Sequence, residues 1–72
     1  MSATSTNEYQ PRAQSALAAS PIYELRDLQV EHRDGMLVIL GSVSSFYHKQ
    51  LAQEVVRSVC RGIDVVNSIL VE

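Results

Sequence analysis

Cysteine occurs once in this sequence, as Cys60. A single thiol cannot close an internal disulfide, so nothing in the sequence requires an oxidising compartment. The sequence also lacks a run of about 18 apolar residues, and we therefore expect no transmembrane segment. Its first ten residues have neither the basic nor the apolar region of a signal peptide. The chain as written is expected to be cytoplasmic, or envelope-associated if a leader precedes it in the full gene product.

An excess of positive charge is missing as well. Six Lys and Arg residues stand against eight Asp and Glu residues, which gives a net charge of −2. Nonspecific nucleic-acid affinity comes mainly from basic side chains that displace counterions, and this balance opposes it. The sequence has neither a GxxG loop nor paired aromatic residues on a strand, two features of RNA-binding modules. We therefore expect no nucleic-acid partner.

The sequence also lacks the patterns on which common catalytic sites are built. There is no glycine-rich phosphate loop and no nucleophile elbow. His32 and His48 are the only imidazoles, and no recognisable spacing brings metal ligands near them. Cys60 lies close to Arg57 and Arg61, which would lower the pKa of its thiol, although an unpartnered cysteine is more often a small core residue. The sequence thus predicts no enzyme, no metal and no cofactor.

What the sequence does have is the composition of one small folded domain. It contains 72 residues, of which 46% are hydrophobic and 19% are charged, far from the composition of disordered chains. Residues 1–10 are polar and without apolar period, so we expect a flexible tail there and a single domain over residues 11–72. Pro11 suits the first turn of a helix, and Ala13 and Leu17 continue with helical spacing. Ser20-Pro21 interrupts that helix, and a brief helical turn is expected over residues 22–25.

The next segment has the period of a strand and the turn of a hairpin. Apolar and polar residues alternate over 28–33, Asp34-Gly35 is a strong signal for a type I′ turn, and 36–43 forms the second strand. A two-residue turn sets Arg33 opposite Met36 and therefore fixes the two faces of the hairpin. One face is expected to carry Leu28, Val30, Leu37, Ile39 and Val43; the other carries Gln29, Glu31 and Arg33 together with Met36, Val38 and Leu40.

A second helix and a third strand complete the chain. Ser44 or Ser45 can cap the start of a helix, and Gly62 can close it from the left-handed C′ position just beyond its end. The helix is expected to turn one apolar stripe toward the core, formed by Tyr47, Leu51, Val55 and Val59 with Ala52 and Val56 beside it. The β-branched segment 65–72 is expected to be a strand. The element order α-β-β-α-β indicates an α+β fold of two layers.

This succession resembles a known family. Its pattern consists of Val30, Asp34-Gly35, Leu37, Ile39, Gly41 and Val43, then Gly62-Ile63, then Val66-Asn67, Ile69 and Val71. It is similar to the BON domain, the bacterial osmotic-stress and nodulation module, over residues 12–72. The resemblance implies a three-stranded mixed sheet with two helices packed on one face. It also implies contact with phospholipid, envelope surfaces or other proteins, and no catalytic residues.

Two surfaces are candidates for such contact. The first is the sheet face without helices, which a two-layer domain leaves uncovered; it suggests association with a protein partner or a second copy of the chain. Its apolar residues are expected to be Met36, Val38, Leu40, Val66 and Leu70. The alternative is a basic line along the second helix, Lys49, Arg57 and Arg61, which would bind anionic phospholipid at a membrane surface or an acidic partner.

Overall fold

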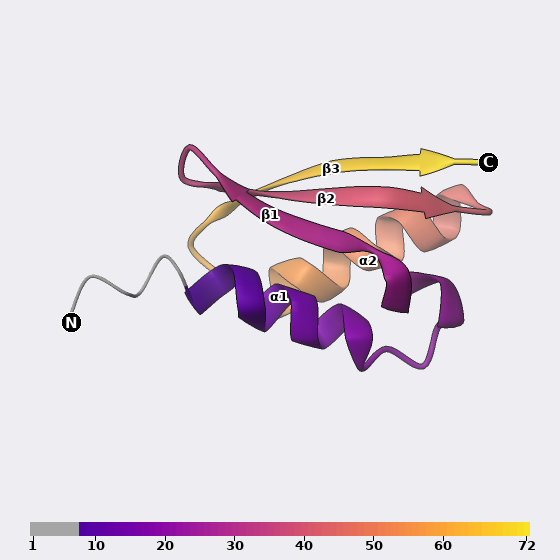
Figure 1. Ribbon diagram of the computed structural model, residues 1–72, viewed down its shortest axis with the longest axis horizontal. Helices are drawn as coiled ribbons and strands as arrows, with labels where there is room; N and C mark the ends of the chain where they lie inside the picture. The colour runs from indigo at the N-terminus through magenta and orange to yellow at the C-terminus, as the bar shows by residue number, and fades with distance from the viewer. Residues whose placement is uncertain (1–7) are drawn as a thin grey trace.

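The computed structural model describes residues 8–72 of the chain. Its elements follow the expected α-β-β-α-β order, with one short 3₁₀ helix, η3, between the first helix and the first strand, and they form the predicted α+β fold (Figure 1). Their bounds are α1 (Tyr9–Ala18), η3 (Tyr23–Asp27), β1 (Gln29–Arg33), β2 (Met36–Val43), α2 (Phe46–Val59) and β3 (Asp64–Val71).

Helix α1 begins at Tyr9, two residues before the expected start at Pro11. A proline is tolerated at this early position because the first four N–H groups of a helix have no partner within it. The first turn is held by tertiary contacts: the Tyr9 hydroxyl donates a hydrogen bond to the Arg61 carbonyl at 3.1 Å. Of the expected tail, residues 1–7 lie outside the described residues, whereas Tyr9 and Gln10 belong to α1.

The β1–β2 hairpin has the type I′ turn at Asp34-Gly35 and the strand register that the sequence predicts. Asp34 and Gly35 have φ angles of 49° and 79°, the positive values that a type I′ turn requires at both central positions. Arg33 is paired with Met36, and the same register continues through Val30 and Ile39. The two faces of the hairpin are therefore those that the two-residue turn predicted.

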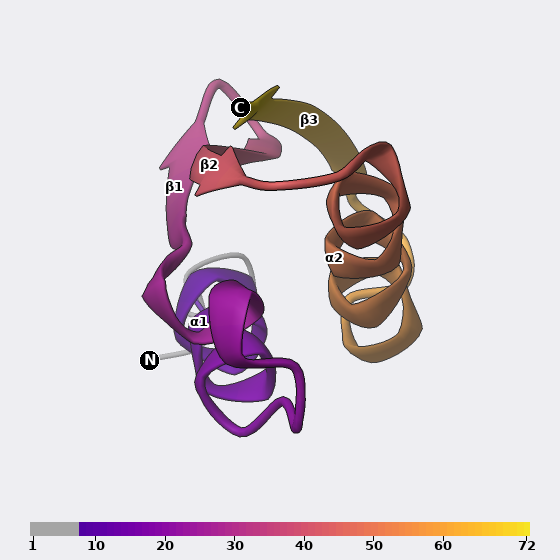
Figure 2. The same cartoon turned by 90° about the vertical axis from the view of Figure 1, so that its right-hand side faces the viewer.

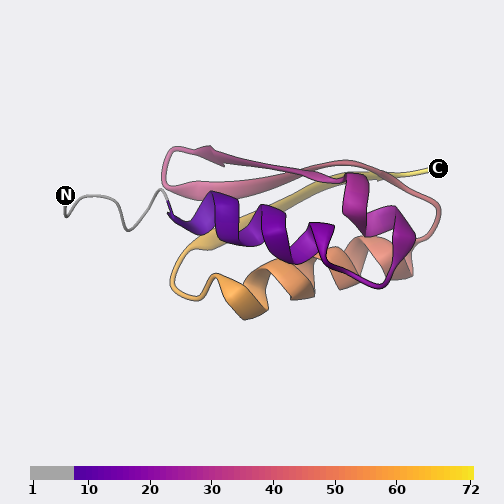
Figure 3. The same cartoon turned by 60° about the horizontal axis from the view of Figure 1, so that its bottom comes forward.

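The sheet is mixed, in the order β1-β2-β3, with β1 antiparallel and β3 parallel to the central strand β2. Both helices lie on one face of it, α1 beneath β1 and α2 on the side of β3 (Figures 2 and 3). The other face, which we call the open face, has no layer over it within residues 8–72. Neither helix in this part of the chain has the length and apolar character needed to cross a bilayer.

The core lies between the sheet and the two helices. It contains the side chains that the hairpin faces predicted, together with Ala13 and Leu17 of α1 and Ile69 of β3. The prediction for α2 was wrong at one position, because Tyr47 is 69% exposed. Ala52 and Val56 are fully buried and mark the side of α2 that faces the core. Each residue of a helix turns by about 100°, so Tyr47, five residues before Ala52, points about 140° away from it and lies outside the buried side.

Helix α2 has a defined start and end. Ser45 is the N-cap, and its hydroxyl accepts a hydrogen bond from the His48 N–H at 3.1 Å. The helix ends at Val59 with Cys60 as its C-cap, one residue earlier than a glycine at the C′ position 62 implies. Gly62, with a φ of 92°, lies in the turn that leads to β3 and supplies the left-handed conformation there.

Candidate functional site

The open face carries the five apolar residues that the sequence analysis assigned to it. Val38 is paired with Val66 across β2 and β3, so apolar side chains of the two strands meet there, whereas Leu70 is paired with Ser42 and is separated from Val66 by Ser68. The exposure of these apolar residues is uneven: Val38 is 8% exposed, whereas Val66 and Leu70 are 38% and 64% exposed. A residue on a central strand is shielded by its neighbours on both sides, and β2 is the central strand. The accessible apolar residues of the open face are therefore Val66 and Leu70 on β3. Met36, Val38 and Leu40 lie beside them on β2 and are less exposed.

A polar margin borders these apolar residues on the side of β1. Glu31 and Arg33 lie on the open face, and their side chains form an ion pair with each other. By the strand register, Glu31 is the neighbour of Val38. The apolar surface is thus displaced toward β3, and the β1 side of the face is charged.

The basic residues of the alternative site do not form one surface. Lys49 is half-buried beside β3, Arg57 is exposed on α2, and Arg61 lies in the turn after the helix. Lys49 and Arg57 are eight residues apart on α2, so their side chains point in directions that differ by about 80° around the helix axis. Within residues 8–72, none of the three forms an ion pair. Lys49 therefore belongs to a different site from the two arginines.

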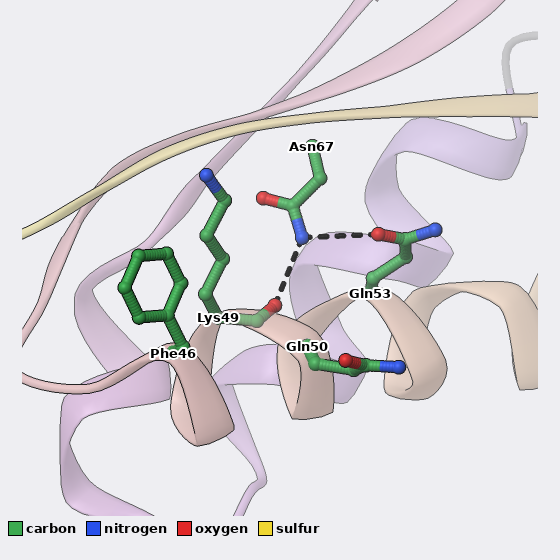
Figure 4. A pocket seen from close by; sticks show the side chains of 5 residues that line it. All are labelled: Phe46, Lys49, Gln50, Gln53 and Asn67. Atoms are coloured by element: carbon green, nitrogen blue, oxygen red, sulfur yellow. Dashed lines mark hydrogen bonds between the residues drawn. The ribbon is translucent and has the colours of Figure 1, made fainter.

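An open pocket of about 290 Å³ lies between α2 and β3 (Figure 4). Its lining residues are Phe46, Lys49, Gln50, Gln53 and Asn67. Asn67 connects the two elements, because its side-chain amide donates hydrogen bonds to the Lys49 carbonyl at 2.9 Å and to Gln53 Oε1 at 3.1 Å. Phe46 is 75% exposed at the mouth. The sequence alone does not predict this pocket; the one sign of it is Asn67, a polar residue at a helix-facing position of a mainly apolar strand.

His48 stabilises the junction between η3 and α2. Its Nδ1 lies 2.7 Å from Glu24 Oε1, and the same carboxylate accepts a hydrogen bond from the Ser44 N–H at 3.0 Å. The backbone hydrogen bond from Ser44, followed by that from His48, lowers the pKa of Glu24 to about 2. The arrangement holds the helix start against η3, so His48 has a structural role.

His32 and Cys60 are packed into the helix-covered side. His32 Nε2 is buried and has no hydrogen-bond partner among residues 8–72. Burial raises the pKa of the Cys60 thiol, and Arg12 opposes this only in part. Cys60 is thus the small core residue that an unpartnered cysteine more often is, and its pKa is shifted in the opposite direction to the lowering by Arg57 and Arg61 that would activate the thiol. In the described part of the chain, no three His, Cys, Asp or Glu side chains gather in a group that could hold a metal ion.

In a comparison with protein families, the model of the BON domain matches residues 7–72. No curated protein and no solved structure matches the chain significantly. The family match spans every element of the fold, including the first turn of α1.

Proposed function

The chain belongs to the BON domain family, and from this membership we propose that it is a noncatalytic association module that binds a second copy of itself through the open face. The family is of a binding type, and its members bind phospholipids or mediate protein association. Of these two roles we propose protein association, with the contact formed by β3 and β2.

The exposure of Val66 and Leu70 is the observation that supports this choice. Both apolar side chains project from the same face of β3, and Met36, Val38 and Leu40 of β2 lie beside them on that face. Fully burying a Val or Leu side chain is worth about 1.5–3 kcal/mol relative to leaving it in water. Two copies that pack face to face would bury the exposed parts of four such side chains, 38% of each Val66 and 64% of each Leu70, and would gain the corresponding share of that energy. Exposed apolar side chains that gather on one uncovered face are typical of association sites.

Peripheral binding of anionic phospholipid is the second candidate function. It is supported by the exposed Arg57 of α2 and Arg61 of the following turn. The exposed aromatic rings of Phe46 and Tyr47 at the start of α2 also support it, since aromatic residues favour the membrane interface. Each basic residue near an anionic surface contributes about 1 kcal/mol. Even with Lys49 included, three such contributions fall below the ~4 kcal/mol of a millimolar complex, and the net charge of −2 opposes them.

Sedimentation with and without anionic vesicles, at low and high salt, separates the two functions. We expect the wild type to form a dimer that salt barely weakens, because apolar contacts are not screened. Val66→Lys with Leu70→Lys should abolish that dimer, and Arg57→Glu with Arg61→Glu should leave it unchanged. A monomeric wild type that pellets with the vesicles at low salt, and loses this binding in the Arg57→Glu, Arg61→Glu variant, would establish the lipid function instead.

A further inference from the structure

The two edges of the sheet differ in how their backbone groups are satisfied. At the β1 edge, the Gln14 side chain accepts a hydrogen bond from the Val30 N–H at 2.9 Å and donates one to the Leu28 carbonyl at 2.7 Å. Gln10 donates to the Val30 carbonyl at 2.8 Å. The side-chain amides of α1 thus occupy the positions that a fourth strand would take. This edge is closed to another strand over these residues.

The β3 edge is open over most of its length. The Glu72 N–H donates to the Val43 carbonyl at 2.8 Å, so the even-numbered residues of β3 bond to β2 and the odd-numbered ones point away from the sheet. Of the outward groups, the Ile69 N–H is satisfied by Asn67 Oδ1 at 3.2 Å. The outward N–H and C=O groups of Val65 and Asn67 have no hydrogen-bond partner within residues 8–72. Unpaired groups in a row are a template for another strand.

The pocket between α2 and β3 lies beside this open edge. Lys49 extends from α2 toward β3, next to Asn67, and Phe46 stands at the mouth (Figure 4). Because side chains alternate between the two faces of a strand, every second side chain of a strand added to β3 would point toward α2. Those side chains would enter the pocket. An open edge beside a helix-lined pocket combines main-chain affinity with side-chain specificity.

We propose that the groove between β3 and α2 binds an extended peptide segment of a partner protein, which adds a fourth strand at β3 and places an acidic side chain against Lys49. The backbone of Val65 and Asn67 supplies the main-chain hydrogen bonds. Lys49 supplies the charge that selects the peptide, since it is half-buried and has no ion-pair partner in residues 8–72. This site extends the proposed association function to a second surface and a different partner.

The charges on β3 oppose a second copy of the chain as the added strand. In the antiparallel register that sets Val66 against Leu70 of the second copy, Asp64 falls opposite Glu72 of the second copy. Like charges in directly opposed positions destabilise a strand pair. The helix-facing residues of β3 are Val65, Asn67, Ile69 and Val71, none of which carries a charge to match Lys49. A different partner strand avoids the repulsion between Asp64 and Glu72, and an acidic residue at its helix-facing position supplies the negative charge opposite Lys49.

Two synthetic peptides test the proposal, acetyl-Thr-Val-Thr-Glu-Thr-Val-Thr-amide and the same peptide with Lys in place of Glu. Binding is measured by fluorescence anisotropy on the full chain. We expect the wild type to bind the Glu peptide at least about tenfold more tightly than the Lys peptide, and Lys49→Glu to reverse that preference. Arg57→Glu is the matched control, since it makes the same charge change on α2 outside the pocket, and it should leave the ratio unchanged.

Backbone pairing is tested separately, in the wild type, by amide hydrogen exchange. The Glu peptide should slow exchange of the Val65 and Asn67 amides, because it hydrogen-bonds to the β3 edge, and should leave the amides of α1 unchanged. Failure of both peptides to bind at about 1 mM would overturn the proposal. So would an equal effect of Lys49→Glu and Arg57→Glu, or slowed exchange only at amides outside β3. Self-association is measured without peptide, so its failure and the failure of this proposal are distinguishable.

Discussion

The side chain of Gln14 pairs with Val30 as the backbone of a neighbouring strand would. Its Oε1 accepts the Val30 N–H at 2.9 Å, while its Nε2 donates to the Leu28 carbonyl at 2.7 Å. One helix residue thereby satisfies two backbone groups at the edge of the sheet. It also fixes the distance between α1 and β1, which places the helix over the core.

Removing this side chain should therefore destabilise the domain. Gln14→Ala leaves a donor and an acceptor unsatisfied at a partly buried edge, and we expect a loss of about 1–3 kcal/mol in the free energy of unfolding. Thermal unfolding followed by circular dichroism measures it, with a fall of about 4–8 °C per kcal/mol for a domain of this size. Gln29→Ala, an exposed glutamine on the open face, is the control and should change stability by less than about 0.5 kcal/mol. Equal effects of the two substitutions would contradict the role of Gln14.

Glu24 should contribute an acid-sensitive part of the stability. Its pKa is about 2 in the folded protein, against 4.5 without these contacts. Because the folded value is the lower one, the stabilisation is fully present above pH 4.5 and is lost as the pH falls toward 2. The stability advantage of the wild type over Glu24→Gln should therefore shrink between pH 5 and about pH 2 in urea unfolding.

The lowered pKa of Glu24 has more than one cause, and they can be separated. The Ser44 N–H is the largest, the His48 side chain is second and the Ser44 side chain is third. His48→Ala should accordingly keep the greater part of the pH dependence that Glu24→Gln removes. If His48→Ala removes as much as Glu24→Gln does, the backbone hydrogen bond is not the main cause.

The turn at Gly35 should tolerate asparagine but not valine. With a φ of 79° and open space around the position of a β-carbon, backbone strain is the only cost of a side chain there. Gly35→Val should cost about 1–3 kcal/mol, whereas Gly35→Asn should cost less than about 1 kcal/mol, since asparagine adopts this conformation more readily. Urea unfolding of the two variants provides the comparison. Equal stability of the two would mean that the backbone at Gly35 is not left-handed.

The hairpin could be predicted from the sequence because its information is local. The Asp34-Gly35 turn fixes the register, and the register fixes which residues face the helices. The start of α1 could not be predicted in the same way. Tyr9 and Gln10 are held by Arg61 and Val30, residues that are distant in the sequence.

The candidate sites were predictable only in part, for the same reason. Alternation along the strands places Val66 and Leu70 on the open face, but the shielding of Val38 depends on β2 being the central strand. The four-residue spacing of Lys49 and Arg57 suggests one line, yet the position of α2 beside β3 directs Lys49 into the pocket. Asn67 joins that pocket only because the two elements meet there.

Self-association through the open face is the central claim, and sedimentation velocity at about 20 μM and about 1 mM tests it most directly. The wild type should shift from one chain toward two as concentration rises, and Val66→Lys with Leu70→Lys should remain a single chain. The matched control is Ser15→Lys with Ala18→Lys, two exposed positions on α1 that add the same charge, and it should behave as the wild type. A wild type that stays a single chain at about 1 mM, or a Val66→Lys, Leu70→Lys variant that associates as strongly as the wild type, would contradict the account.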